Sequence, residues 1–288
     1  MNELKGLGVA MVTPFKKNKE IDFVALEKLT NKLIDGGLDY LVVMGTTGES
    51  ATLSAEEKQQ VLNSVRTINN GRLPLVFGIG GNDTAKMMKE FNSFDLTGVS
   101  AILTASPYYN KPSQEGIYQH YSELAKVSKL PILLYNVPGR TGSNMTSSTT
   151  LRLAKEFDNI MGIKEASGDM GQVMEIIQEK PADFLLISGD DALTLPMIAC
   201  GAEGLISVIA NSHPETTKEL VEKSMKGDFD SARVAHYALL KLIDGIFEDG
   251  NPGGVKVLLH EQGIMENELR LPLVPVNKVL EARLRTLN

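Results

Sequence analysis

Eight short apolar runs, separated by longer amphipathic segments, constrain what this chain of 288 residues can fold into. Each run is apolar at nearly every position, as a strand is when helices cover one face of a sheet and a packed core covers the other. The runs recur roughly every 20 to 35 residues, which leaves room for one helix between neighbouring strands. They lie at 7–12, 40–44, 75–79, 101–104, 132–135, 161–164, 184–188 and 205–208.

Helix-start signals precede several of the amphipathic segments. Asp22, Asp83 and Ser113 each stand directly before such a segment. Ser54 is followed three residues later by Glu57, the pattern of a capping box. Further amphipathic segments cover about 147–156, 169–179 and 191–200.

A regular series of eight strand–helix units favours a closed (β/α)8 TIM barrel of the α/β class, because an open doubly wound sheet rarely needs so many repeats. We expect the barrel to occupy residues 1–225. Residues 226–288 hold further amphipathic segments around a glycine-rich turn and are too short for an independent module. We therefore predict that 226–288 form a C-terminal helical appendage of the same domain.

The net charge, the cysteine count and the length of the apolar runs limit which partners and which cellular compartment we expect for this chain. The formal net charge of −7 argues against a nucleic-acid or membrane partner. The single cysteine excludes an internal disulfide and fits a reducing compartment, while no apolar run approaches the ~20 residues of a membrane-spanning helix. With no signal-peptide pattern at the N-terminus, we expect a cytoplasmic protein. The histidines are scattered along the sequence, and no nucleotide-binding glycine motif is present. We therefore expect neither a bound metal nor a cofactor.

Lys164 is the most informative residue at a strand end. It closes an apolar run, so its ammonium group is expected in an enclosed barrel mouth, where desolvation lowers the pKa of a lysine. A neutral amine there can attack a carbonyl carbon and form a Schiff base. The alternative is a structural ion pair with Glu165 or another carboxylate, although neighbours along a strand point in opposite directions.

Three other strand ends add candidate groups. Tyr135 ends the adjacent strand and can relay protons with Thr46, or it is simply a rim tyrosine. The Gly-Thr-Thr-Gly turn at 45–48 can hold a small anion, or it is an ordinary strand-to-helix turn. Arg140 can clamp a second carboxylate, or it is a solvated loop arginine.

Charge favours a carboxylate over a phosphate as the bound anion. Barrel enzymes often bind phosphate in the loops after the seventh and eighth strands, and here the first of these loops carries Asp190 and Asp191. A dianion is disfavoured beside two carboxylates. We therefore expect carboxylate substrates, held at Thr46, Thr47 and Arg140.

Six motifs, spread in order along nearly the whole chain, resemble the dihydrodipicolinate synthase family. They are GTTGES at 45–50, PYYNKPSQEG at 107–116, YNVPGRTG at 135–142, GIKEASGD at 162–169, SGDD at 188–191 and GLISVIAN at 204–211. The resemblance implies a homo-oligomer, expected to be a tetramer built as a dimer of dimers. It also implies an enzyme of class I aldolase type that condenses pyruvate with L-aspartate-4-semialdehyde, a lyase of the diaminopimelate route to lysine.

The resemblance also implies roles for single residues. Lys164 matches the Schiff-base lysine of the family. The proton-relay triad corresponds to Tyr135, Thr46 and Tyr109, with Tyr109 supplied by the neighbouring subunit. Thr47 matches the contact to the pyruvate carboxylate and Arg140 the contact to the semialdehyde carboxylate, while Gly189 and Ile206 are expected to line the site.

This sequence departs from the family pattern at two places. Asn251-Pro-Gly-Gly-Val-Lys256 carries two glycines at positions that are stiffer in the family, which predicts a looser turn. Members that lysine inhibits have a glutamate and two histidines at positions that match Lys86, Ala55 and Lys58 here. We therefore expect free lysine to inhibit weakly.

Two alternative functions remain at this stage. N-acetylneuraminate lyases and 2-keto-3-deoxy-sugar-acid aldolases share the lysine and the tyrosine, but Arg140 and the stretch at 108–112 favour the synthase. A barrel without catalytic activity, serving as a binding scaffold, is the other alternative. The joint presence of Lys164, Tyr135, Thr46 and Tyr109 argues against it.

Overall fold

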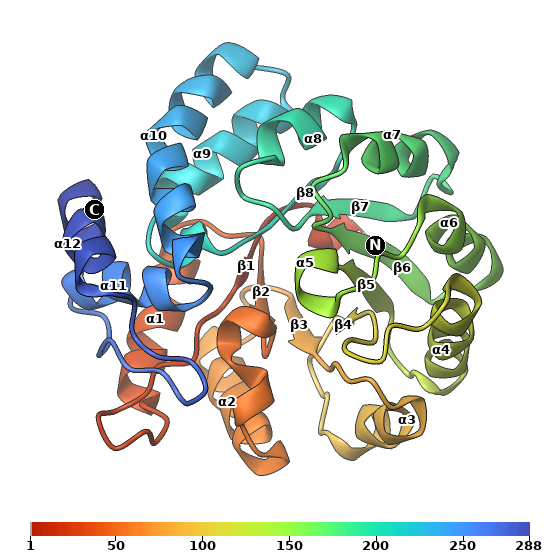
Figure 1. The fold of residues 1–288 in the computed structure, drawn as a ribbon, viewed down its shortest axis with the longest axis horizontal. Coiled ribbons are helices and arrows are strands. Elements are labelled where there is room, and N and C mark those ends of the chain that lie inside the picture. The colour runs from red at the N-terminus through yellow and green to blue at the C-terminus, as the bar shows by residue number, and fades with distance from the viewer. Residues whose placement is uncertain (1) are drawn as a thin grey trace.

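The computed structural model describes residues 2–288 and contains a closed barrel of eight parallel strands in chain order (Figure 1). This confirms the predicted TIM barrel, and each strand boundary lies within two residues of its expected position. The strands are β1 Gly6–Ala10, β2 Tyr40–Val43, β3 Leu75–Gly78, β4 Ala101–Ala105, β5 Ile132–Asn136, β6 Ile160–Glu165, β7 Leu185–Ser188 and β8 Gly204–Ser207.

Helices surround the strands, and the predicted start signals are confirmed. Asp22, Asp83 and Ser113 accept backbone N–H groups at the first turns of their helices, and Ser54 and Glu57 form a capping box. The helices of the ring are α1 Phe23–Asp35, α2 Ala55–Asn69, α3 Thr84–Ser93, α4 Gln114–Val127, α6 Ser147–Glu156, α7 Met170–Glu179, α8 Thr194–Cys200 and α9 Pro214–Met225. The one-turn helix α5, Pro138–Thr141, was not predicted.

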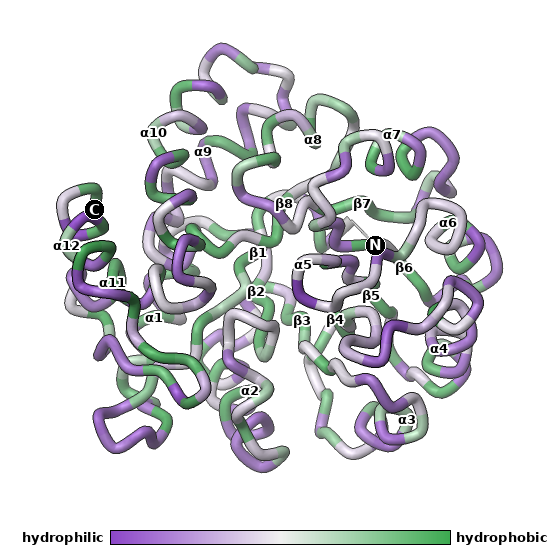
Figure 2. The backbone as a smooth tube through the Cα atoms, in the orientation of Figure 1, coloured by the Kyte–Doolittle hydropathy of each residue, from purple (hydrophilic) through white to green (hydrophobic). Residues whose placement is uncertain are grey.

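Apolar side chains pack on both sides of the barrel wall. Alternate strand residues point inward, so Leu133 and Tyr135 belong to an interior cluster, while Ile132 and Leu134 pack under the helices. Figure 2 shows strand β7 in apolar colour and the surrounding helices in mixed colours. Because the interior is filled, the functional space is confined to the end of the barrel.

The C-terminal segment is helical, as the fold prediction states. Helices α10 Phe229–Glu248, α11 Gly253–Glu261 and α12 Lys278–Leu287 follow the last ring helix, and α10 packs along α9 (Figure 1). The division at residue 225 into barrel and appendage stays a prediction. Within residues 2–288, none of the helices combines the length and apolar character that crossing a membrane requires.

The prediction of a looser turn at the two glycines is wrong. Gly253 and Gly254 are the first residues of helix α11, and both are buried. A Cβ added at Gly254 would lie 2.4 Å from the Cα of Ile246 in helix α10. The glycine therefore permits the backbones of α10 and α11 to cross in close contact, and it serves packing rather than flexibility.

We predict that Gly254→Ala destabilises the fold by about 2 kcal/mol, because the new methyl group must displace the backbone of α10. Thermal unfolding measures the effect. Gly80→Ala is the matched control, since a Cβ at that glycine meets no atom within 4 Å. Equal melting temperatures for the two variants would contradict the close crossing.

Candidate active site

A cavity of about 710 Å³ opens at the carboxyl ends of the barrel strands. Active sites of this architecture lie at that end, because loops from all eight strands meet there. Six of the eight predicted site residues line the cavity: Thr46, Thr47, Tyr135, Arg140, Lys164 and Gly189. Helix α10 adds a wall that was not predicted, with Asp244, Phe247 and Glu248.

Lys164 and Tyr135 face each other inside the cavity. They are register partners on β6 and β5, and the lysine Nζ lies 4.4 Å from the centre of the tyrosine ring. Burial lowers the pKa of Lys164 to about 8. The positive charge of Arg140 lowers this pKa further, whereas the negative charge of Asp191 raises it. Burial likewise raises the pKa of Tyr135 to about 12. The pair thus consists of an amine that is readily neutralised and a phenol that stays protonated.

The alternative ion pair between Lys164 and Glu165 is contradicted. Glu165 points to the other side of strand β6, where its carboxylate accepts hydrogen bonds from Asn136, Gln172 and the backbone N–H of Ser167. Strand alternation, on which the prediction relied, therefore separates the two side chains.

The two aspartates after β7 have different environments. Asp190 lines the cavity, and its carboxylate accepts the N–H groups of Ala192 and Leu193. Asp191 is buried, where it accepts hydrogen bonds from Ser207 and the N–H of Val208. Burial raises the pKa of Asp191 to about 6. Its negative charge favours the ammonium form of Lys164, so it moderates the effect of desolvation.

Gly189 has a steric reason to lack a side chain. A Cβ at this position would lie 2.9 Å from the Cε of Lys164 and 2.8 Å from the Cβ of Ala166. The glycine therefore leaves room for the lysine stem. Its position directly after a strand end, beside the lysine strand, is the signal that marks it in the sequence.

The turn after β2 is a 3-10 helix, Thr46–Gly48. Thr46 is exposed to the cavity, whereas Thr47 is buried and its hydroxyl accepts a hydrogen bond from Asn251 at 2.9 Å. Because the amide donates to this oxygen, the hydroxyl hydrogen of Thr47 is free to donate to an anion in the cavity.

A buried ion pair that sequence reasoning missed fixes the same turn. Lys256 donates to Glu49 at 2.5 Å, and both side chains are fully buried. Lys256 also donates to the backbone oxygens of Thr13 and Glu268, and Glu49 accepts the N–H of Arg270. The sequence does contain a sign of this ion pair, because Lys256 lies inside the apolar run Val255–Leu259. A buried charge at such a position is costly unless it has a partner.

The remaining predicted site residues differ in whether they reach the cavity. Arg140 is exposed on α5 and lines the cavity. Tyr109 is 87% exposed, has a positive φ of 73°, and is not among the residues that line the cavity. Ile206 is fully buried in the interior cluster, while Val208, two residues later, lines the cavity. The expected roles of these residues stay predictions.

Metal ligands are not grouped at this site. Among residues 2–288, no three histidine, cysteine, aspartate or glutamate side chains come together as a metal-binding set.

The family model described as the dihydrodipicolinate synthetase family matches residues 3–287. The chain belongs to this family. A curated 4-hydroxy-tetrahydrodipicolinate synthase from Flavobacterium psychrophilum is 54% identical over 99% of the chain and 97% of that protein.

Solved structures of family members agree with the fold. The synthase of Acinetobacter baumannii in complex with pyruvate superposes with a TM-score of 0.95 at 38% identity, covering 99% of this chain and 97% of that one. The synthase of Cyanidioschyzon merolae with lysine bound gives a TM-score of 0.95 at 35% identity, with the same coverage. The synthase fold therefore extends over essentially the whole described chain.

We predict a rate of imine formation between Lys164 and pyruvate that rises about tenfold per pH unit below pH 8 and levels off above it. The neutral amine is the nucleophile, and a lowered pKa supplies it at lower pH. Rapid quenching with borohydride at a series of pH values measures the rate. A rise that continues to pH 10, as for an ordinary lysine, would contradict the lowered pKa.

Proposed function

We propose that the chain is a 4-hydroxy-tetrahydrodipicolinate synthase, which condenses pyruvate with L-aspartate-4-semialdehyde in the diaminopimelate route to lysine. The observation that carries the proposal is the position of Lys164. A buried amine with a pKa of about 8 faces a cavity that also holds Tyr135, two threonine hydroxyls and a loop arginine. The names of relatives that align with nearly the whole chain support the same reaction.

The first step is formation of the imine. The Lys164 nitrogen attacks the carbonyl carbon of pyruvate, a proton reaches the carbonyl oxygen, and water leaves as the C=N bond forms. The amine lies 4.4 Å from the centre of the Tyr135 ring, and we assign to the phenol of this residue the giving and taking of these protons. Thr46, which lines the same cavity, can pass them on.

The second step joins the two substrates. Loss of a proton from the methyl carbon of the imine gives an enamine, whose carbon attacks the aldehyde carbon of the semialdehyde while the aldehyde oxygen takes up a proton. We assign the pyruvate carboxylate to Thr47 and the semialdehyde carboxylate to Arg140, since both residues line the cavity together with Lys164 and Tyr135 and both can donate hydrogen bonds to a carboxylate. Release follows when the substrate amine displaces Lys164 from the carbon.

The third member of the proton relay is assigned to Tyr109 of a neighbouring subunit. In the single chain this tyrosine is 87% exposed and outside the cavity lining, as a residue would be if it completes another copy's site. The proposal therefore includes a homo-oligomer, with a tetramer as the expected form.

A substrate panel tests the reaction. We expect turnover of pyruvate with L-aspartate-4-semialdehyde, and no release of pyruvate from sialic acid or from 2-keto-3-deoxy-sugar acids. Efficient cleavage of a sugar acid without condensation would overturn the proposal in favour of the alternative aldolases.

We predict that Arg140→Ala raises the KM for the semialdehyde by about a hundredfold and leaves the KM for pyruvate within a few-fold, because a bidentate carboxylate contact contributes roughly 2–3 kcal/mol. Steady-state kinetics with each substrate varied in turn makes the comparison. Parallel changes in both constants would indicate that Arg140 supports the loop and does not bind substrate.

We also predict weak inhibition by free lysine, with half-inhibition above the millimolar range. Lys86 is exposed on α3, where it places a positive charge at a position that is a glutamate in lysine-sensitive members. Titration of lysine at saturating pyruvate measures the effect. Half-inhibition well below one millimolar would refute it.

A further inference from the structure

A layer of polar side chains lies directly behind the residues that line the cavity. On β5 and β6, Tyr135 and Lys164 face inward, and the next residues, Asn136 and Glu165, are register partners on the outer face. The Asn136 amide donates to the Glu165 carboxylate at 3.0 Å. The pair that lines the cavity is thus backed by a second pair on the same two strands.

Glu165 is buried and is satisfied by amide donors. It is 1% exposed, and it accepts the Ser167 N–H at 2.6 Å and the Gln172 side chain at 3.0 Å in addition to Asn136. A buried carboxylate is costly unless its oxygens are hydrogen-bonded. The carboxylate therefore holds these amides in fixed positions.

The same network closes the loop of residues 137–146, which carries Arg140. Asn136, just before the loop, accepts the N–H of Met145 at 3.0 Å and donates to the Asn144 side chain at 2.7 Å. Asn144 in turn donates to Gln172 at 2.8 Å. The two ends of the loop are therefore tied to each other and to the buried carboxylate.

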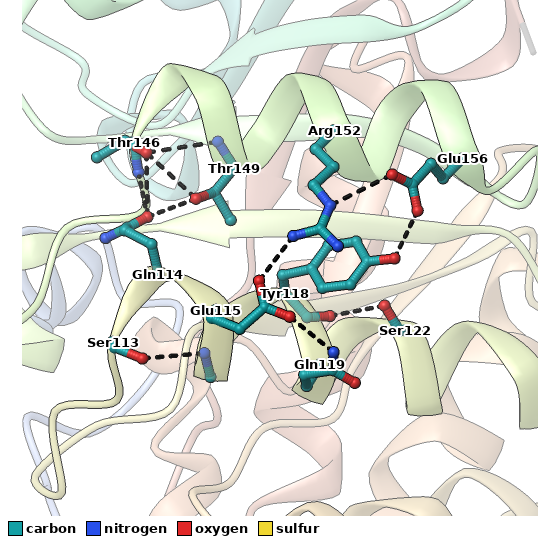
Figure 3. A network of polar contacts seen from close by, with 11 residues as sticks. Ser113, Gln114, Glu115, Tyr118, Gln119, Ser122, Thr146, Thr149, Arg152 and Glu156 are labelled. Carbon is teal, nitrogen blue, oxygen red and sulfur yellow. Dashed lines mark hydrogen bonds and ion pairs between the residues drawn. The ribbon is translucent and has the colours of Figure 1, made fainter.

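Gln114, the first residue of α4, holds the loop from outside. Its amide nitrogen donates to the backbone oxygen of Asn144 at 2.7 Å. Its oxygen accepts from the Thr146 N–H at 3.1 Å and from the Thr149 hydroxyl at 2.6 Å (Figure 3). Since Thr146 is the N-cap of α6, Gln114 fixes the point at which the loop becomes a helix.

Contacts between α4 and α6 keep Gln114 in reach of the loop. The Arg152 guanidinium of α6 stacks over the Tyr118 ring of α4, at 3.3 Å from the ring centre, and donates to Glu115 at 2.7 Å. Figure 3 shows these groups along the facing sides of the two helices. The position of the loop thus depends on a helix pair that does not itself line the cavity.

We propose that this network, made of Gln114, Asn136, Asn144, Glu165 and Gln172, positions the Arg140 loop and thereby sets the affinity for the second substrate. The inference rests on the proposed function. A guanidinium recognises a carboxylate through two parallel hydrogen bonds, so a small displacement of the loop weakens binding of the semialdehyde. Thr47, which is assigned to the pyruvate carboxylate, follows β2, and the hydrogen bonds of Gln114 reach residues 144–149 rather than Lys164 or Tyr135. Loss of Gln114 is therefore expected to move the loop without changing pyruvate binding or imine formation.

The test compares Gln114→Ala with Gln119→Ala, a glutamine on the same helix whose amide donates to the exposed Glu115 side chain (Figure 3). We expect Gln114→Ala to raise the KM for the semialdehyde about tenfold, with the KM for pyruvate and the rate of borohydride trapping within twofold of wild type. Hydrogen exchange of the peptide covering 137–146 is expected to be faster in this variant alone. Gln114→Glu keeps the acceptor for Thr146 and Thr149 and is expected to recover part of the affinity.

Three results would overturn the inference. They are an unchanged KM for the semialdehyde, an equal rise in both KM values, or unchanged hydrogen exchange at 137–146 in Gln114→Ala. Wild-type protein that fails to condense the two substrates would refute the proposed function instead, and the exchange measurement would still decide whether the network holds the loop.

Discussion

The desolvation of one lysine amine is the constraint on which the rest of this site depends. Lys164 ends an inward-facing row on β6, so the barrel interior removes water from its stem and lowers its pKa to about 8. Closure of the barrel supplies the apolar surroundings, and the absence of a side chain at Gly189 supplies the space. Burial alone does not distinguish Lys164 from Lys256. Its pKa is also lowered to about 8 by burial, but it donates to Glu49 and to two backbone oxygens and lies outside the cavity.

Two buried polar clusters hold the loops that complete the site. The Lys256 and Glu49 pair connects α11 to the turn that carries Thr46 and Thr47, and the Glu165 cluster connects β5, β6 and α4 to the loop of Arg140. Buried charges are poor contributors to net stability, since their desolvation offsets their attraction, but they tolerate few geometries. These clusters thus give definite positions to two loops that contain few apolar side chains. Through Lys256, the C-terminal helix α11 takes part in holding one of these loops.

Local sequence patterns, such as apolar runs and helix-start residues, predicted the barrel and most of the candidate site. Strand positions followed from apolar runs, helix starts from residues such as Asp22 and Ser54, and the opposite directions of Lys164 and Glu165 from strand alternation. Contacts between distant segments were not predictable in this way. Glu49 and Lys256 are separated by 207 residues, and nothing near either residue indicates the partner. Local rules associate two consecutive glycines with a turn, so the prediction for Gly253 and Gly254 was a loose turn. Their actual role depends on the crossing of α10 and α11, which is a tertiary contact that local rules do not describe.

The most direct test is to locate the pyruvate adduct. The wild-type protein is treated with pyruvate and borohydride, digested, and mapped by mass spectrometry, so that Lys164 and the second buried lysine with a lowered pKa, Lys256, are compared in one sample. A single reduced adduct on Lys164 is the predicted result. An adduct on Lys256 or on a surface lysine, with Lys164 unmodified, would contradict the assignment of the reactive amine to the end of β6.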